Sequence, residues 1–199
     1  RSGADSVLLP KVSDPADLAA AQAALGPGHP TRLWAMMETP LPMTGAAAIA
    51  AAAQGAAPSL AVLVMGPNDL AKETGARLLP GRALYLPWLA QCLAAARGAG
   101  LSIIDGVWNA LDDAEGFAEE CRQGRDLGMD GKTLIHPSQI EPCNRIFAPD
   151  AAEIDWARRV VALFHAPENR GAGALRLDGR MVERLHAEMA RRVLARAGQ

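Results

Sequence analysis

The sequence predicts an α/β fold built on a parallel β-sheet, and three observations lead to this prediction. Short runs of apolar and β-branched residues alternate five times with longer segments of helical pattern. These runs are almost wholly apolar, which is typical of strands that are covered on both faces. Successive strands lie about 30 residues apart, which leaves room for one helix in each right-handed crossover.

The predicted elements follow one another as strand and helix. Strands are expected at 6–12, 32–37, 60–65, 101–104 and 131–135. Helices are expected at 18–25, from Thr44 onward in an alanine-rich segment, at 84–97, from Asp112 onward and at 151–164. Asp14 and Pro15 suit the start of the first helix, and Gly26 ends it. The acidic residues from Asp112 suit the positive end of a helix dipole.

The chain is expected to divide near its C-terminal end. Residues 1–168 are predicted to form the βα units, with the helix at 151–164 belonging to the fifth unit. The glycine-containing segment 169–173 is interpreted as a hinge. Residues 175–197 form an arginine-rich amphipathic tail, so 169–199 are interpreted as a helical lid or docking arm. The alternative is a C-terminal helix that packs on its own domain.

Composition excludes several functional classes. The 199 residues are 50% hydrophobic and 21% charged, with a net charge of −2, which argues against a disordered or nucleic-acid-binding chain. Aromatic residues make up only 4% of the chain, so platforms for base stacking are not expected. The three cysteines, at 92, 121 and 143, form no CxxC pair, and a reducing cytoplasm is expected. No segment has the length and hydrophobicity of a membrane span, and no membrane partner is expected.

A polar residue follows each predicted strand at the point where its apolar run stops. These residues are Lys11, Glu38, Asp69, Asp105 and His136. In parallel α/β folds and barrels, reactive groups lie at the carboxyl ends of strands. The recurrence of polar residues at this one position therefore indicates a functional site.

Two of these residues suit a metal ion. Glu38 and Asp69 follow neighbouring strands, and two carboxylates can hold Mg²⁺ while leaving positions for water and substrate. The alternative is that both acids make structural hydrogen bonds or cap helices. Lys11 fits either an anionic substrate or a structural salt bridge, and His136 fits either a substrate contact or a structural role before Pro137.

Other chemistries lack support in the sequence. The histidines are not spaced as zinc ligands, and neither a GxGxxG motif nor a P-loop occurs. A GxSxG motif is also absent, which argues against a nucleophilic hydrolase.

Five segments in order along the chain together resemble the citrate lyase β-subunit-like branch of the HpcH/HpaI aldolase superfamily, which includes malyl-, citramalyl- and citryl-coenzyme A lyases. The segments are Leu9-Pro10-Lys11-Val12, Met36-Met37-Glu38-Thr39-Pro40, Gly66-Pro67-Asn68-Asp69-Leu70-Ala71, Asp105-Gly106-Val107 and Gly131-Lys132-Thr133-Leu134-Ile135-His136-Pro137-Ser138-Gln139-Ile140. The resemblance runs from about residue 4 to the end of the tail.

The resemblance implies a (β/α)₈ TIM barrel, with Glu38 and Asp69 as ligands of Mg²⁺. It implies cleavage of a carbon–carbon bond in a 3-hydroxyacyl-coenzyme A, and Glu38, Lys11 and His136 are the expected substrate contacts. It also implies a homotrimer or hexamer, in which an acid on the C-terminal arm acts in the site of a neighbouring subunit. Glu183 occupies that position within Asp178-Gly179-Arg180-Met181-Val182-Glu183.

The chain departs from the family pattern in two respects. The family has aspartate where this chain has Glu183, and the added methylene shifts the carboxyl group. By this resemblance the chain carries the last five of eight βα units. We expect an upstream segment to supply the first three, and the alternative is a truncated protein that lacks them. A carbon–carbon lyase is the favoured function. A malyl-coenzyme A-type thioesterase, a 2-oxo-acid aldolase and a non-catalytic subunit are the alternatives.

Overall fold

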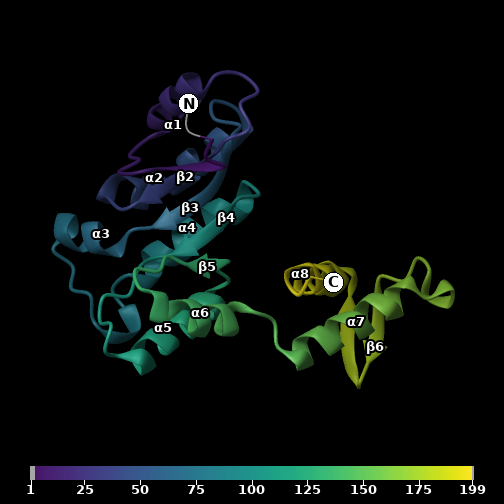
Figure 1. Ribbon diagram of the computed structural model, residues 1–199. Coiled ribbons are helices and arrows are strands. Elements are labelled where there is room, and N and C mark those ends of the chain that lie inside the picture. Colours follow the sequence, from purple (N-terminus) through teal and green to yellow (C-terminus); the bar gives the residue numbers. More distant parts are fainter. Residues whose placement is uncertain (1–2, 199) are drawn as a thin grey trace. The chain divides into compact units, whose positions relative to one another are not determined.

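The computed structural model describes residues 3–198, which fold into two compact units (Figure 1). Residues up to Phe147 form the first unit, and residues from Ala148 onward form the second. This boundary lies before the hinge predicted at 169–173.

The first unit contains the predicted parallel sheet. Its strands are β1 (Ser6–Leu9), β2 (Arg32–Met37), β3 (Leu60–Met65), β4 (Ser102–Asp105) and β5 (Gly131–Lys132). All four pairings are parallel, and the strand order is the chain order β1-β2-β3-β4-β5. The five predicted strands are therefore confirmed, although β1 and β5 are shorter than expected. The sheet is open, with β1 and β5 at its edges, so a closed barrel is not confirmed.

Helices and 3₁₀ turns connect the strands. They are α1 (Pro15–Leu25), α2 (Pro40–Ala51), η1 (Ala52–Gln54), α3 (Pro67–Thr74), η2 (Pro80–Arg82), α4 (Leu86–Gly98), α5 (Ala114–Leu127), η3 (Pro137–Gln139) and α6 (Ile140–Phe147). The start of α1 is confirmed, because Asp14 and Asp17 form a reciprocal capping box around Pro15. Helix α2 begins at Pro40, earlier than the predicted Thr44, because proline is favoured in the first helical turn.

The sheet is less evenly covered than its apolar sequence predicts. In β2 the side chains of Leu33, Ala35 and Met37 are buried, whereas Trp34 and Met36 are only half-buried. Because strand order follows chain order, right-handed crossovers place the helices on the same face of the sheet. The core of the first unit lies between that face and the helices. The face of β2 that carries Trp34 and Met36 is therefore less covered than the face that carries Leu33, Ala35 and Met37.

The second unit has a small core of its own. It consists of α7 (Ala151–His165), η4 (Pro167–Asn169), β6 (Ala174–Leu177), β7 (Arg180–Glu183) and α8 (Arg184–Arg196). Helix α7 packs against α8, with Val160, Val182 and Ala190 buried in the shared core. The sequence pattern assigned α7 to the fifth βα unit, whereas in the structure α7 packs against α8.

The predicted helical arm also contains a β-hairpin. Strands β6 and β7 pair antiparallel, with Ala174 opposite Glu183 and Leu177 opposite Arg180. Asp178 and Gly179 form the turn, and both have positive φ, as two-residue hairpin turns require. The longest helix described, α7, has 15 residues, and between residues 3 and 198 no helix is long and apolar enough to cross a membrane.

Candidate metal and substrate site

Three of the predicted residues meet at the carboxyl ends of β1, β2 and β3. The backbone N–H of Lys11 donates to Oε1 of Glu38 at 2.8 Å. The Lys11 Nζ atom lies 3.8 Å from Oδ1 of Asp69. One residue therefore contacts both carboxylates that the sequence assigned to a metal ion.

Glu38 is held by close packing as well as by this hydrogen bond. It follows directly after β2, and only 7% of its surface is exposed. Its side chain lies against Gly66, the residue before α3. A Cβ atom at Gly66 would come within 2.4 Å of the Glu38 Cβ atom and 3.0 Å of Oε2. Glycine is required at this position so that the glutamate side chain can lie across the backbone.

Asp69 lies in the first turn of α3, two residues after Pro67. A carboxylate is favourable at this end of a helix because the exposed N–H groups give it a partial positive charge. The Gly66 N–H donates to the carbonyl of Met37 at 3.0 Å, which ties the start of α3 to the end of β2. The backbone thus places Glu38 and Asp69 at adjacent positions on the same edge of the sheet.

Lys11 has an unusual backbone conformation. Its φ is +50°, in the left-handed region that residues with a side chain seldom adopt. Such strain costs on the order of 1 kcal/mol and is concentrated at functional sites. The Ser13 hydroxyl group donates to the Lys11 carbonyl at 3.1 Å and stabilises this turn. The left-handed turn presents the Lys11 N–H to one carboxylate and its ammonium group to the other.

The two carboxylates fit a hard divalent cation. Carboxylate oxygens are the ligands that Mg²⁺ prefers, and Mg²⁺ usually takes only one or two of them from the protein. Across residues 3–198, no three acidic, histidine or cysteine side chains converge as a metal cage would require. A site of Glu38 and Asp69 would therefore leave coordination positions for water and substrate.

Asp105 does not belong to this site, although it also ends a strand. Its side chain is fully buried and lies against Gly124 of α5. Its two oxygens accept hydrogen bonds from Arg82 Nη1 at 2.7 and 2.9 Å, and Lys132 Nζ lies 3.3 Å away. Lys132 also pairs with Glu120 at 2.6 Å. Asp105 is therefore the centre of a buried ionic cluster that also contains Arg82, Lys132 and Glu120.

The other two predicted residues make local contacts. His136 is exposed at the start of η3, where its Nδ1 atom accepts from the Ser138 N–H at 3.2 Å and lies 2.8 Å from the Ser138 hydroxyl. Glu183 lies in the second unit, where it immediately precedes α8. Its backbone N–H donates to Nδ1 of His186 at 2.9 Å.

Sequence reasoning missed two features beside the strand ends. Asn68 and Asn109 form a reciprocal pair of amide hydrogen bonds of 3.1 and 2.8 Å, which joins the loops after β3 and β4. Arg82, with φ of +52°, completes the cluster around Asp105. Neither feature has a sequence signal, because each partner lies more than 20 residues away in the chain. For Asp105 itself, the sequence signal was its position directly after an apolar strand.

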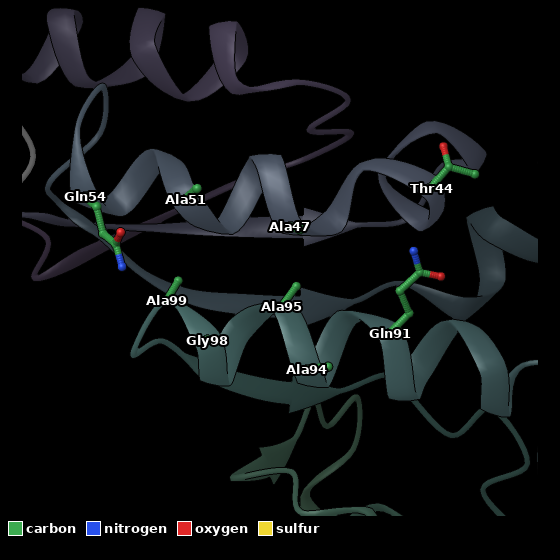
Figure 2. Close-up of a pocket in the computed structure, with 9 residues that line it drawn as sticks. All are labelled: Thr44, Ala47, Ala51, Gln54, Gln91, Ala94, Ala95, Gly98 and Ala99. Carbon is green, nitrogen blue, oxygen red and sulfur yellow. The ribbon is translucent and has the colours of Figure 1, made fainter.

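A shallow groove elsewhere in the first unit has no such chemistry (Figure 2). It lies between α2 and α4, has a volume of about 460 Å³ and is lined mainly by alanines, with Thr44, Gln54 and Gln91 as its polar side chains. None of its lining residues is charged, and none is a predicted site residue. The groove therefore contributes no group to the site at the strand ends.

Comparisons with known proteins agree on one family. Residues 1–137 match the family model described as HpcH/HpaI aldolase/citrate lyase. A (3S)-malyl-CoA thioesterase of Cereibacter sphaeroides is 53% identical over 194 residues, which cover 98% of this chain and 65% of that protein. The citrate lyase subunit beta of Escherichia coli is 35% identical over 99% of this chain and 67% of its own length.

A solved structure is similar over almost the whole chain. It is the CitE protein of Mycobacterium tuberculosis in complex with magnesium, acetoacetate and coenzyme A. The TM-score is 0.77 at 30% sequence identity, and the alignment covers 98% of this chain and 69% of that one. This chain thus spans about 65% of the length of the malyl-CoA thioesterases that it matches.

Proposed function

Because the chain belongs to the HpcH/HpaI aldolase/citrate lyase family, we propose that it acts on a malyl-type 3-hydroxyacyl-coenzyme A in a magnesium-dependent reaction. The observation that carries this proposal is the pair of carboxylates, Glu38 and Asp69, that Lys11 links at adjacent strand ends. Hydrolysis of the thioester is the favoured reaction, since the more similar of the two enzymes compared is a thioesterase.

Glu38 and Asp69 are the proposed ligands of the metal ion. When bound there, magnesium would supply positive charge that polarises the oxygens at the acid end of the substrate. Glu38 is suited to this role because the Lys11 N–H and Gly66 hold its carboxylate in one orientation. Asp69 is more exposed and faces solvent, where a substrate can approach. His136 is a proposed substrate contact through Nε2, because its Nδ1 atom is engaged with Ser138.

In the proposed hydrolysis, the thioester C–S bond breaks and a C–O bond to water forms. Glu183 accepts a proton from the attacking water and returns a proton to the leaving sulfur, so that free coenzyme A and a dicarboxylic hydroxy acid are released. Glu183 is proposed to act in the site of a neighbouring subunit, which requires a homo-oligomer such as a trimer or hexamer.

Carbon–carbon cleavage is the second candidate, and the similarity to citrate lyase subunit beta favours it. In that reaction the bond between C2 and C3 of the acyl group breaks. The hydroxyl group on C3 loses its proton to solvent water as it becomes the new carbonyl. The carbon next to the thioester takes the electron pair of the broken bond, and Glu183 gives that carbon a proton and is reprotonated by solvent. The products are acetyl-coenzyme A and a 2-oxo acid. The longer side chain of Glu183, where the family has aspartate, moves the proton donor for this step.

The two reactions are distinguished by their products from (S)-malyl-coenzyme A in the presence of Mg²⁺. Hydrolysis releases a free thiol, measured with a disulfide dye, and no acetyl-coenzyme A. Carbon–carbon cleavage releases acetyl-coenzyme A and glyoxylate, measured by chromatography, and no thiol. Glu38→Gln and Asp69→Asn should each lower the rate at least about 100-fold, and EDTA should abolish it. Formation of neither product would refute the proposal and support a non-catalytic subunit.

The action of Glu183 in a neighbouring subunit is tested by mixing two inactive variants. Glu38→Gln and Glu183→Gln are each expected to be inactive. Mixed oligomers regain activity only if one subunit supplies Glu38 and its neighbour supplies Glu183. Absence of recovery after subunit exchange, verified by mass spectrometry of the mixed oligomer, would place both residues in one subunit's site.

A further inference from the structure

The side chain of Lys11 lies where it can affect the binding of both the metal ion and the substrate. Its ammonium group lies 3.8 Å from Asp69, one of the two carboxylates proposed to hold the metal ion. The side chains of Lys11 and Asp69 are 56% and 41% exposed, so both remain accessible to solutes. In the absence of a metal ion, the lysine therefore acts as the counter-ion of this carboxylate.

A divalent cation competes with the ammonium group for Asp69. A magnesium ion carries twice the charge of the ammonium group and binds carboxylate oxygens directly, so it displaces the lysine from this partner. The charges of Glu38, Asp69 and a divalent cation sum to zero. The displaced ammonium group then gives the site a net charge of +1, which attracts a carboxylate of the substrate.

We infer that Lys11 makes binding ordered, because its ammonium group is released from Asp69 by the metal ion and only then binds the substrate's carboxylate. This inference deepens the proposed function and rests on the metal site described there. The backbone of Lys11 has a separate task, since its N–H holds Glu38 whatever the side chain does. A substitution of the side chain therefore changes the charge at the site while leaving this hydrogen bond in place.

The test uses Lys11→Met and measures binding instead of turnover. Isothermal titration of Mg²⁺ should show affinity about two- to fivefold higher than for the unsubstituted protein, because a competing charge has been removed. Titration of the magnesium-saturated protein with pyruvate, used as a small anionic probe, should show affinity lower by about tenfold or more, because a charge-assisted hydrogen bond has been lost. Without Mg²⁺, pyruvate should bind weakly to both proteins.

Two matched controls accompany this variant. Lys11→Arg keeps the positive charge and should restore both affinities to near those of the unsubstituted protein. Arg122→Met removes an exposed positive charge that pairs with Glu119 on α5 and should change neither affinity more than about twofold. Far-UV circular dichroism verifies that each variant is folded.

The opposite signs of the two responses exclude a merely structural role. If Lys11→Met weakens the binding of Mg²⁺ as well as pyruvate, Lys11 only orders the carboxylates and the inference is wrong. Unchanged pyruvate affinity would also overturn it. Failure of the proposed metal site gives a different result, since Glu38→Gln and Asp69→Asn would then bind Mg²⁺ as tightly as the unsubstituted protein.

Discussion

Replacing Asp105 with alanine removes the carboxylate that two buried cations share. Arg82 is 4% exposed, and the side chain of Lys132 is fully buried. The substitution deletes two hydrogen bonds from Arg82 and one from Lys132, together with the bond from the Gly106 N–H at 2.8 Å. Glu120 is then the one carboxylate that remains to balance both cations in this cluster.

The expected loss of stability follows from this uncompensated charge. Removing one partner of a buried ion pair costs about 3–5 kcal/mol. Glu120 still contacts Lys132 at 2.6 Å and Arg82 Nε at 3.3 Å. We therefore expect a loss of stability of about 3 kcal/mol, at the lower end of this range. A loss of that size lowers the midpoint of thermal unfolding by about 6–12 °C in a protein of this length.

Urea denaturation followed by far-UV circular dichroism measures this loss as a change in the free energy of unfolding. Asp105→Asn keeps an acceptor for the Gly106 N–H and should cost less than Asp105→Ala. Glu141→Gln is the control, because the pair of Glu141 with Arg145 is 73% and 67% exposed and should contribute about 0.5 kcal/mol or less. If Asp105→Ala costs no more than this control, the cluster is hydrated and the reasoning is wrong.

Three further predictions concern close packing and a buried thiol. Gly106→Ala would place Cβ 2.1 Å from Cδ of the Pro67 ring and should destabilise the protein by about 1–3 kcal/mol in urea denaturation. Gly66→Ala would place Cβ 2.4 Å from Cβ of Glu38 and should lower Mg²⁺ affinity at least about tenfold in calorimetric titration. Burial raises the pKa of the Cys92 thiol to about 12, from 9.0 for an exposed thiol. As pH rises, the Cys92 thiol ionises first in the unfolded protein. The free energy of unfolding should therefore fall by about 1.4 kcal/mol per pH unit between pH 9 and 12.

Each of these predictions has a control. Gly45→Ala introduces a Cβ atom with nothing within 4 Å in the interior of α2, so it should preserve Mg²⁺ affinity and raise stability by about 0.5–1 kcal/mol. A similar effect at Gly45 and Gly66 would contradict the role of close packing against Glu38. Cys92→Ala removes the titrating thiol, so stability should fall less steeply above pH 9 than in the unsubstituted protein. Equal slopes would show that Cys92 does not contribute to this pH dependence.

Much of the first unit follows from local sequence patterns. Strands β2 and β3 have the predicted bounds, because long apolar runs between turn residues specify them without ambiguity. The start of α1 is equally local, since Asp14 and Asp17 bond each other's backbone. Strand β5 is shorter than its apolar run because the chain leaves the sheet after Thr133, whose N–H still donates to the Asp105 carbonyl at 2.9 Å, and leads into η3.

The parts that sequence reasoning missed depend on long-range contacts. Helix α7 has a pattern that fits either unit, and in the structure it packs on α8. The hairpin at 174–183 lies in a segment whose arginines and apolar residues also suit a helix. At the site, the sequence predicted that Lys11, Glu38 and Asp69 share one edge of the sheet. It could not predict that Lys11 contacts the other two through different atoms, because this depends on its left-handed backbone.

The division of the chain at Phe147 and Ala148 has a consequence for how this family can evolve. Glu38 and Asp69 lie in the first unit, and Glu183 lies in the second unit, which has a hydrophobic core of its own. A genetic crossover at this junction leaves both hydrophobic cores whole. Exchange between relatives of the DNA that encodes residues from Ala148 onward would then replace the residue at position 183 in one inherited step, while the DNA that encodes Glu38 and Asp69 is transmitted unaltered.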